Sequence, residues 1–296
     1  MSIKERRMNS RLVASACLLM ILLCCSCGKK STEGESKAVT RYDTYTGALS
    51  VSCDAGLEPI IKQHKEVFEY LYDSVQLRIG YKTEKEMFAD FRSKKSGVML
   101  LARPLTEGEI KSFKNSDTIY IKQLPVANDA VALIGSTDFD DKDLDVALLE
   151  KYFDPKNSSQ SPPLVFGDQN SSVVRFVLDY LGYKEKVSAN VFALKTNEEV
   201  IDYVSKNSNV IGFIPFNLIS DTDDERVKKL LERIKILSLR AKTTEGGTTR
   251  VSANQSDIIT GDYPLIRKLN AVTRYTRVDN LESLFISFLC KEKRYF

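Results

Sequence analysis

The chain has 296 residues, 43% of them hydrophobic, and carries 43 Lys and Arg against 40 Asp and Glu. It holds a single histidine and six cysteines, four of them within residues 17–27, and the rest of the chain has no CxxC pair and no Cys/His cluster. The sequence therefore does not offer the ligand residues of a zinc site or the residues of a Ser-His catalytic pair.

The N-terminus combines basic residues with a short apolar run. Four basic residues among the first eleven precede an apolar stretch over residues 12–25, which is typical of a secretory signal and too short to span a bilayer as a mature helix. Ser26 and Cys27 at its end resemble the lipobox of bacterial lipoproteins. That resemblance implies a signal peptide over residues 1–26 and lipidation of Cys27. Plain secretion and an uncleaved anchor are the alternatives.

Loss of this signal removes the apparent basicity of the chain. Four of the 43 basic residues and one of the 40 acidic residues lie in residues 1–26, which leaves 39 of each. A neutral chain has no electrostatic footprint for nucleic acid, so no nucleic-acid partner is expected. Residues 27–46 are polar and predict a flexible tether. Only Cys53 and Cys290 remain beyond it, and we expect two buried free thiols rather than a disulfide.

Strand patterns alternate with helical patterns through the rest of the chain. Such alternation predicts an α/β fold with largely parallel sheets and helices on their faces. In the first half, strands and helices are expected in pairs over 48–53 and 56–73, 75–82 and 84–93, and 97–104 and 106–115. A long β-prone stretch without a helix follows at 119–136 and could pass from one lobe into another.

The second half continues the alternation. Its expected elements are, in chain order, a helix at 145–153, a strand at 162–168, a helix from Ser171 or Ser172, a strand at 191–196, a helix at 197–207 and a strand at 210–220. Residues 221–235 predict a charged, exposed helix or loop, and 236–241 a strand. Residues 242–264 are polar and turn-rich, and 264–274 predict a strand before a last helix over 280–293.

Three strand ends run into helix N-termini through small or polar residues. In open α/β sheets, ligands bind at the carboxyl ends of strands, where helix N–H groups lack internal partners and the dipole favours anions. Two of these junctions lie in the first half and one in the second, which suggests a cleft between lobes. The candidate ligand-binding residues there are Asp54, Ala55, Gly56, Leu57, Ala102, Arg103, Asp168, Asn170, Ser171, Ser172 and Val173.

The same segments resemble motifs of the substrate-binding proteins of phosphate ABC transporters. Residues 53–59 match the frame of the family's first turn, and Leu-Ala-Arg-Pro-Leu at 101–105 resembles its Ser-Arg-Pro-Leu turn. Asn-Ser-Ser-Val at 170–173 stands where the family has Gly-Ser-Gly-Thr. The segment at 127–134 resembles the crossover strand, and those at 210–216 and 263–269 match the later Ile-Gly-Tyr and Tyr-Pro-Leu-x-Arg-x-Leu signatures.

The resemblance implies a two-lobed periplasmic-binding-protein fold, each lobe a mostly parallel sheet flanked by helices. It implies lobe I over residues 47–129, lobe II over 130–235, and a return segment with the rest of lobe I over 236–296. The return crossing is expected within 221–240 or near Tyr263.

The function implied by the resemblance is binding without chemistry. A lipid-anchored monomer on the periplasmic side of the cell envelope would close its lobes around inorganic phosphate and deliver it to an ABC transporter permease. Neither a cofactor nor a metal is expected.

The expected ligand chemistry replaces the hydration shell of the anion by fixed dipoles. Backbone N–H groups at the first and third junctions could supply them, together with the hydroxyls of Ser171 and Ser172. Arg103 would be the bidentate countercharge, and Arg175 is the alternative cation.

Two carboxylates stand at the same junctions. Asp54 or Asp168 would accept the proton that hydrogen phosphate carries and sulfate lacks, because a buried acceptor left unpaired costs about 1–3 kcal/mol. Selectivity for phosphate over sulfate is therefore expected.

Each candidate also has a plainer interpretation. Asn170 to Ser172 could form an ordinary helix cap, Asp54 a cap without ligand contact, and Arg103 a surface residue. Family members often carry an anion-pairing Arg where this chain has Gly167. The rival functions are a binder of sulfate or molybdate, a receptor or interaction lipoprotein on the same fold, and a hydrolase that uses Ser171 or Ser172.

Overall fold

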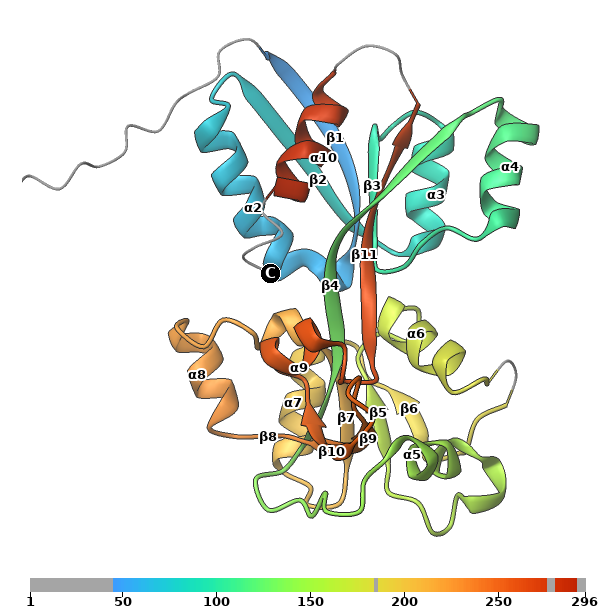
Figure 1. Cartoon of the computed structure of the whole chain (residues 1–296), viewed down its shortest axis with the longest axis vertical. Helices are drawn as coiled ribbons and strands as arrows, with labels where there is room; N and C mark the ends of the chain where they lie inside the picture. Colours follow the sequence, from blue (N-terminus) through green and yellow to red (C-terminus); the bar gives the residue numbers. More distant parts are fainter. Residues whose placement is uncertain (1–44, 184–185, 276–279, 292–296) are drawn as a thin grey trace, which may run out of the picture. The chain divides into compact units, whose positions relative to one another are not determined.

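A computed structural model describes residues 45–183, 186–275 and 280–291 (Figure 1). The predicted signal peptide, Cys27 and nearly all of the tether lie outside the described residues. The described residues belong to one compact unit. None of the helices in the described ranges is long and apolar enough to cross a membrane.

The first sheet has the strand order β2-β1-β3-β11-β4. Strands β1 (Gly47–Asp54), β2 (Val75–Lys82) and β3 (Val98–Leu101) are parallel. Strand β11 (Ile266–Arg274) runs antiparallel to both β3 and β4 (Ile121–Gly135). The sheet is flanked by α2 (Glu58–Leu71), α3 (Glu84–Arg92), α4 (Glu107–Asp117) and α10 (Leu281–Lys291).

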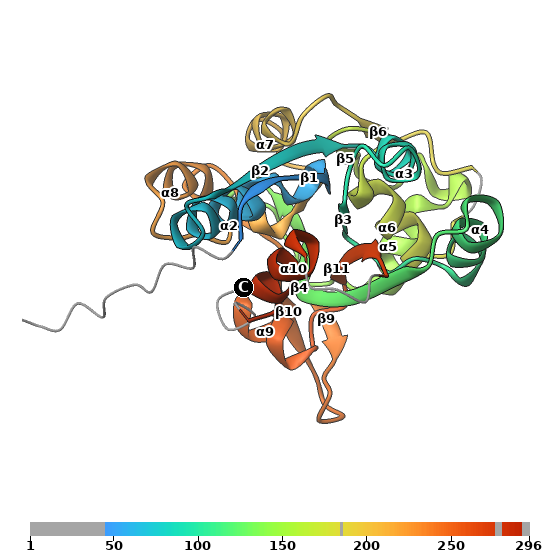
Figure 2. The ribbon, with the colours of Figure 1, turned by 90° about the horizontal axis from the view of Figure 1, so that it is seen from above.

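Both faces of the first sheet are covered, because alternate side chains of a strand point to opposite faces. Val98 and Leu100 of β3 join a core with α2 and α10, where the rings of Phe68 and Phe285 lie 5.2 Å apart. Their neighbours Met99 and Leu101 join a second core with α3 and α4. Figure 2 shows these helices around the sheet from above.

The second sheet has the order β4-β7-β5-β6, with β8 (Lys235–Ile236) also paired to β4. Strands β5 (Leu164–Phe166), β6 (Val191–Ala193) and β7 (Ile211–Pro215) are parallel. Its helices are α5 (Val146–Phe153), α6 (Ser172–Tyr180), α7 (Asn197–Ser205) and α8 (Glu225–Leu231). Short 3-10 turns η1 (Ala55–Leu57), η2 (Pro155–Asn157) and η3 (Phe216–Leu218) complete the strand-to-helix junctions and loops.

Strand β4 belongs to both sheets, which confirms the predicted crossover. Its residues 121–130 pair with β11 in the first sheet, and its residues 131–135 pair with β7 or β8 in the second. The chain returns through β11, just after Tyr263, so the second of the two expected places for the return crossing is the correct one. In Figure 1 both strands run between the two sheets.

The segment over 236–264 contains more structure than its sequence indicates. A predicted strand at 236–241 is split between β8 and β9 (Ser238–Lys242), and the turn-rich stretch after it holds β10 (Thr248–Ser252) and α9 (Gln255–Thr260). Side chains from Leu237 to Leu265 pack in the core of the second sheet. The lobe bounds remain a prediction, and this packing would extend the second lobe from residue 235 to about residue 265.

The two cysteines of the body are free thiols, as expected. Cys53 is buried, but Cys290 is only half-buried, so the prediction was wrong on that point. The mixed α/β architecture with two helix-flanked sheets confirms the predicted fold class.

Candidate functional site

Asp54 ends β1 and begins the turn into α2. Its Oδ1 accepts a hydrogen bond from the Gly56 N–H at 2.9 Å and so caps η1. Its Oδ2 is buried and has no hydrogen-bond partner among the described residues. The residue is 4% exposed, so this oxygen is an acceptor held away from water.

Arg267 lies beside Asp54, although it comes from β11 at the other end of the chain. Its Nε donates to Asp129 Oδ2 at 2.8 Å, across the β11–β4 ladder, and its Nη1 donates to Ser172 Oγ at 2.9 Å. Its Nη2 lies 2.7 Å from Asp129 Oδ2, yet has no well-directed hydrogen bond among the described residues. Arg267 is 2% exposed. Its hydrogen bonds to Ser172 and Asp129 join the first turn of α6 to the crossing strands.

The backbone at Gly56 brings these groups together. A Cβ placed on Gly56 would lie 3.3 Å from Asp54 Oδ1, 3.5 Å from Ser172 Oγ and 3.6 Å from Arg267 Nη2. We call Asp54, Gly56, Ser172 and Arg267 the buried cluster. Because Gly56 has no side chain, one carboxylate, one hydroxyl and one guanidinium can lie close to its backbone.

The electrostatics of the buried cluster raise the pKa of Asp54. Burial raises the pKa of Asp54, and the Arg267 charge and the Ser172 hydroxyl offset only part of that effect. The more distant Glu84 raises it further. A carboxyl of this kind holds a proton more readily than an exposed Asp does.

Arg103, the predicted countercharge, is engaged elsewhere. Its Nε and Nη2 donate to Glu84, its Nη1 and Nη2 donate to Glu109, and its Nη1 also donates to the Pro104 carbonyl. Burial alone would raise the pKa of Glu109, but hydrogen bonds from Arg103 and the Thr106 N–H lower it to about 2. Arg103 therefore stands as a structural cation within the first lobe.

Arg175, the alternative cation, pairs with the same acid. Its Nη1 donates to Glu84, which starts α3 in the first lobe, and its Nε lies 3.5 Å from Asp179 on its own helix. This ion pair connects α6 with α3.

The remaining candidate residues form local turns and helix caps or are distinguished by their burial. Asp168 is exposed and accepts from the Asn170 N–H at 2.8 Å, so it forms a local turn away from the buried cluster. Ser171 caps α6, with its Oγ accepting from the Val174 N–H at 3.4 Å. Leu57, Ala102 and Val173 are buried, and Ala55 is exposed.

Of the predicted site residues, the structure brings Asp54, Gly56 and Ser172 close together, and it adds Arg267, which was not among the candidates. The signal was present in Tyr-Pro-Leu-Ile-Arg-Lys-Leu at 263–269, where it served only as a family signature. At Gly167, where the resemblance places an anion-pairing Arg, a Cβ would lie 2.7 Å from Asn197 Oδ1.

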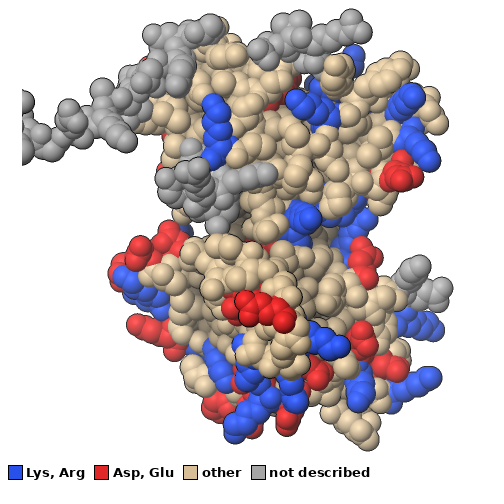
Figure 3. All heavy atoms as spheres, in the orientation of Figure 1, with Lys and Arg blue, Asp and Glu red and all other residues tan. Residues whose placement is uncertain are grey.

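The outer surface carries charges of both signs. Basic and acidic side chains are interspersed over the lower lobe on the face shown in Figure 3. Within the described ranges, no three His, Cys, Asp or Glu residues are grouped so that they could hold a metal ion.

Known structures share this architecture at low identity. A possible phosphate binding protein from Planctomyces limnophilus DSM 3776 is 19% identical with a TM-score of 0.56, over 83% of this chain and 88% of that chain. A putative phosphate ABC transporter substrate-binding protein from Clostridium perfringens, solved with bound phosphate, is 18% identical with a TM-score of 0.62, over 82% and 93%. The OxyR2 regulatory domain from Vibrio vulnificus is 11% identical with a TM-score of 0.57, over 85% and 98%. These likenesses show a common fold.

One curated relative matches only in part. L-seryl-tRNA(Sec) selenium transferase from Campylobacter concisus (strain 13826) is 33% identical over 112 residues, which are 37% of this chain. The match spans 23% of that protein's length.

The family model gives a match over nearly the whole described chain. The model of the PBP superfamily domain covers residues 32–292. The chain therefore belongs to the PBP superfamily domain family and has the two-lobed fold of periplasmic binding proteins.

Proposed function

We propose that this chain is a lipid-anchored, extracytoplasmic binding protein for inorganic phosphate that closes its lobes on the ion and delivers it to an ABC transporter permease. The observation that carries the proposal is the buried cluster, in which Arg267 and Ser172 present donors beside Asp54 Oδ2, an atom without a hydrogen-bond partner in the described part of the chain. Solved relatives of the same fold include a phosphate ABC transporter substrate-binding protein with bound phosphate.

Phosphate would take donors from both lobes. The Ser172 hydroxyl and the first N–H groups of α6 come from the second lobe, and the N–H groups of the 55–57 turn come from the first. Arg267 would supply the positive charge and exchange its hydrogen bond to Ser172 for bonds to the ion. Ser171, Val173, Ala102 and Leu57 would shape the wall.

Asp54 would select phosphate over sulfate. Its buried Oδ2 needs a donor, which hydrogen phosphate can offer and sulfate cannot. Sulfate carries no proton to donate to this carboxylate, so the two negative charges would repel each other. Asp54 thereby takes the selective role that the sequence left open between Asp54 and Asp168.

Closure is supported by the contacts that already join the lobes. Asn217, after β7, donates from Nδ2 to the Gly56 carbonyl at 2.9 Å, and Arg175 of α6 pairs with Glu84 of α3. Opening would break these bonds and bend the two crossing strands β4 and β11.

Transport and anchoring complete the proposal. The Cys27 lipid would hold the protein at the membrane surface, with residues 28–46 as the tether. A chain that only binds and releases an ion needs neither a catalytic base nor a cofactor.

The test is calorimetric titration of the purified, extensively dialysed protein with phosphate and then with sulfate at neutral pH. We expect saturable one-to-one binding of phosphate and no binding of sulfate. Equal affinity for both ions would remove the role of Asp54. No binding of either ion by a folded sample would contradict the phosphate function and favour a receptor on the same fold.

A further inference from the structure

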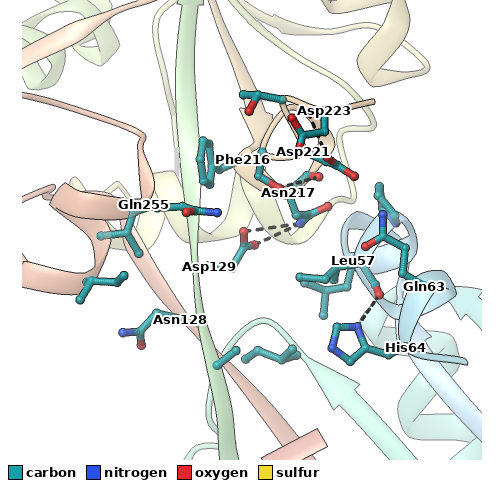
Figure 4. A pocket seen from close by; sticks show the side chains of 18 residues that line it. Leu57, Gln63, His64, Asn128, Asp129, Phe216, Asn217, Asp221, Asp223 and Gln255 are labelled. Atoms are coloured by element: carbon teal, nitrogen blue, oxygen red, sulfur yellow. Dashed lines mark hydrogen bonds between the residues drawn. The ribbon is translucent and has the colours of Figure 1, made fainter. Parts of the chain in front are cut away.

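A second site lies between α2 and the loop that follows β7. A pocket of about 410 Å³ is bounded by the first turns of α2, by β4 at residues 127–129, by residues 216–223 and by α9 (Figure 4). Its lining includes none of Asp54, Ser172 and Arg267. The pocket therefore lies beside the buried cluster, and its lining residues Asp129 and Asn217 are bonded to Arg267 and to the Gly56 carbonyl of that cluster.

The walls of this pocket combine hydrocarbon with negative charge. Leu57 and Ile60 from the first lobe face Phe216, Ile258 and Ile259 from the second. Its acidic lining residues are Asp129, Asp221 and Asp223, and none of the described lining residues is Lys or Arg. Asp129 is already paired with Arg267, so the uncompensated charge comes from Asp221 and Asp223, which are exposed.

Asn217, which lines this pocket, has an unused acceptor among the described residues. Its Nδ2 lies 2.9 Å from the Gly56 carbonyl and 3.4 Å from Asp129 Oδ2, both of which are acceptors. The amide nitrogen must face them, which fixes the orientation of the side chain and turns Oδ1 away from them. That Oδ1 is buried with no partner among the described residues, and Asn217 is only 8% exposed.

We propose that this pocket binds an organic ammonium ion with an aromatic or aliphatic body. The ammonium group donates to Asn217 Oδ1, close to Asp221 and Asp223, which lie on the same side of the pocket (Figure 4). The hydrocarbon body packs against Phe216 and Ile258. Because the walls come from both lobes, such a ligand also stabilises their closed arrangement.

The test uses three probes of one shape and different charge. Calorimetric titration with 2-phenylethylammonium is expected to show saturable binding, with 2-phenylethanol at least about ten-fold weaker and phenylacetate not bound, since only the cation complements the site. Equal binding of all three probes, or no binding of the cation, overturns the proposal. The phosphate titration is run separately, so this result and that of the phosphate function can be told apart.

Variants assign the binding to this pocket. The double variant Asp221→Asn with Asp223→Asn should weaken the cation about ten-fold and leave the alcohol unchanged, because it removes charge without changing shape. Glu107→Gln on α4 is the matched control, since Glu107 is an exposed carboxylate outside the pocket, and it should change nothing. Unchanged cation affinity in the double variant, or an equal loss in the control, overturns the proposal.

Discussion

Two arginines near the junction of the lobes contrast sharply. The Arg103 side chain is 17% exposed and meets the carboxylates of Glu84 and Glu109. The Arg267 side chain is 1% exposed, pairs with a single carboxylate, Asp129, and donates a hydrogen bond to the Ser172 hydroxyl. Arg103 donates to two acids, one of which, Glu84, also pairs with Arg175, whereas Arg267 keeps an Nη2 that lacks a well-directed bond among the described residues.

The contrast teaches that availability, rather than proximity to a motif, decides which cation can meet an anion. A guanidinium whose donors are all taken must break ion pairs before it can bind a ligand. Arg267 needs to give up only a neutral hydrogen bond to Ser172. The following predictions test whether the two arginines differ in this way.

Removal of Arg267 should have the largest effect. Arg267→Met leaves the buried Asp129 carboxylate without its cation, which costs about 3–5 kcal/mol. Urea unfolding should show this loss, and titration should show no saturable phosphate binding.

A double variant separates stability from binding. Arg267→Met with Asp129→Leu removes both charges, so much of the stability should return, because an apolar pair often replaces a buried ion pair at little cost. Phosphate binding should stay absent. A double variant that binds phosphate normally would make Arg267 a purely structural residue like Arg103.

Asp54→Asn should change both selectivity and the pH dependence of stability. The folded-state pKa of Asp54 is raised, so above the ordinary value of 3.8 the unfolded chain loses this proton before the folded chain does. Stability of the ligand-free protein therefore falls as pH rises from 3.8 through the folded-state pKa, and the variant should lack that fall. Thermal melts of the pair across this range measure the difference. Titration should also show the preference for phosphate over sulfate reduced about ten-fold.

Ser171 and Ser172 should separate capping from ligand contact. Ser171→Ala removes the cap of α6 and should cost about 0.5–1 kcal/mol in urea unfolding with little change in phosphate affinity. Ser172→Ala should weaken phosphate about ten-fold, because it removes the hydroxyl beside Arg267. The opposite assignment of effects would place the ion nearer the exposed loop at Asn170.

Arg103→Ala should have the smallest effect on binding, less than about two-fold in titration, and should cost about 1 kcal/mol in stability because its pairs are partly exposed. The effect on stability should depend on pH. Hydrogen bonds from Arg103 and Thr106 outweigh burial and lower the pKa of Glu109 to about 2, so this contribution is present above 4.5 and disappears as pH falls toward 2. Melts of the variant should lack that acid-side loss. A large drop in phosphate affinity would show that Arg103 leaves its acids for the ligand.

Local signals predicted the helix caps at the candidate site, whereas contacts between residues distant in the sequence could not be predicted. The cap at Ser171 and the turn at Asp54 depend on neighbouring residues, so their pattern is visible in the sequence. Arg267 meets Asp129 across 138 positions, and only the pairing of β11 with β4 brings them together. No periodic pattern reports such a contact.

Helix α9 was missed for a related reason. Its six residues lie in a polar stretch, and a helix of this length is too short for the apolar residues to repeat at helical spacing. Its Asn254 cap and the packing of Ile258 in the second core stabilise it, and that core is assembled from the whole second lobe.

The double crossing of β4 and β11 also sets an order for assembly during synthesis. The core of the second sheet is drawn from residues 130–265, a continuous stretch that is complete before β11 leaves the ribosome. The first sheet must wait, because β11 lies between β3 and β4 and α10 covers its face. The growing chain thus carries one finished lobe beside an open sheet whose unpaired edges need protection until residues 266–291 arrive.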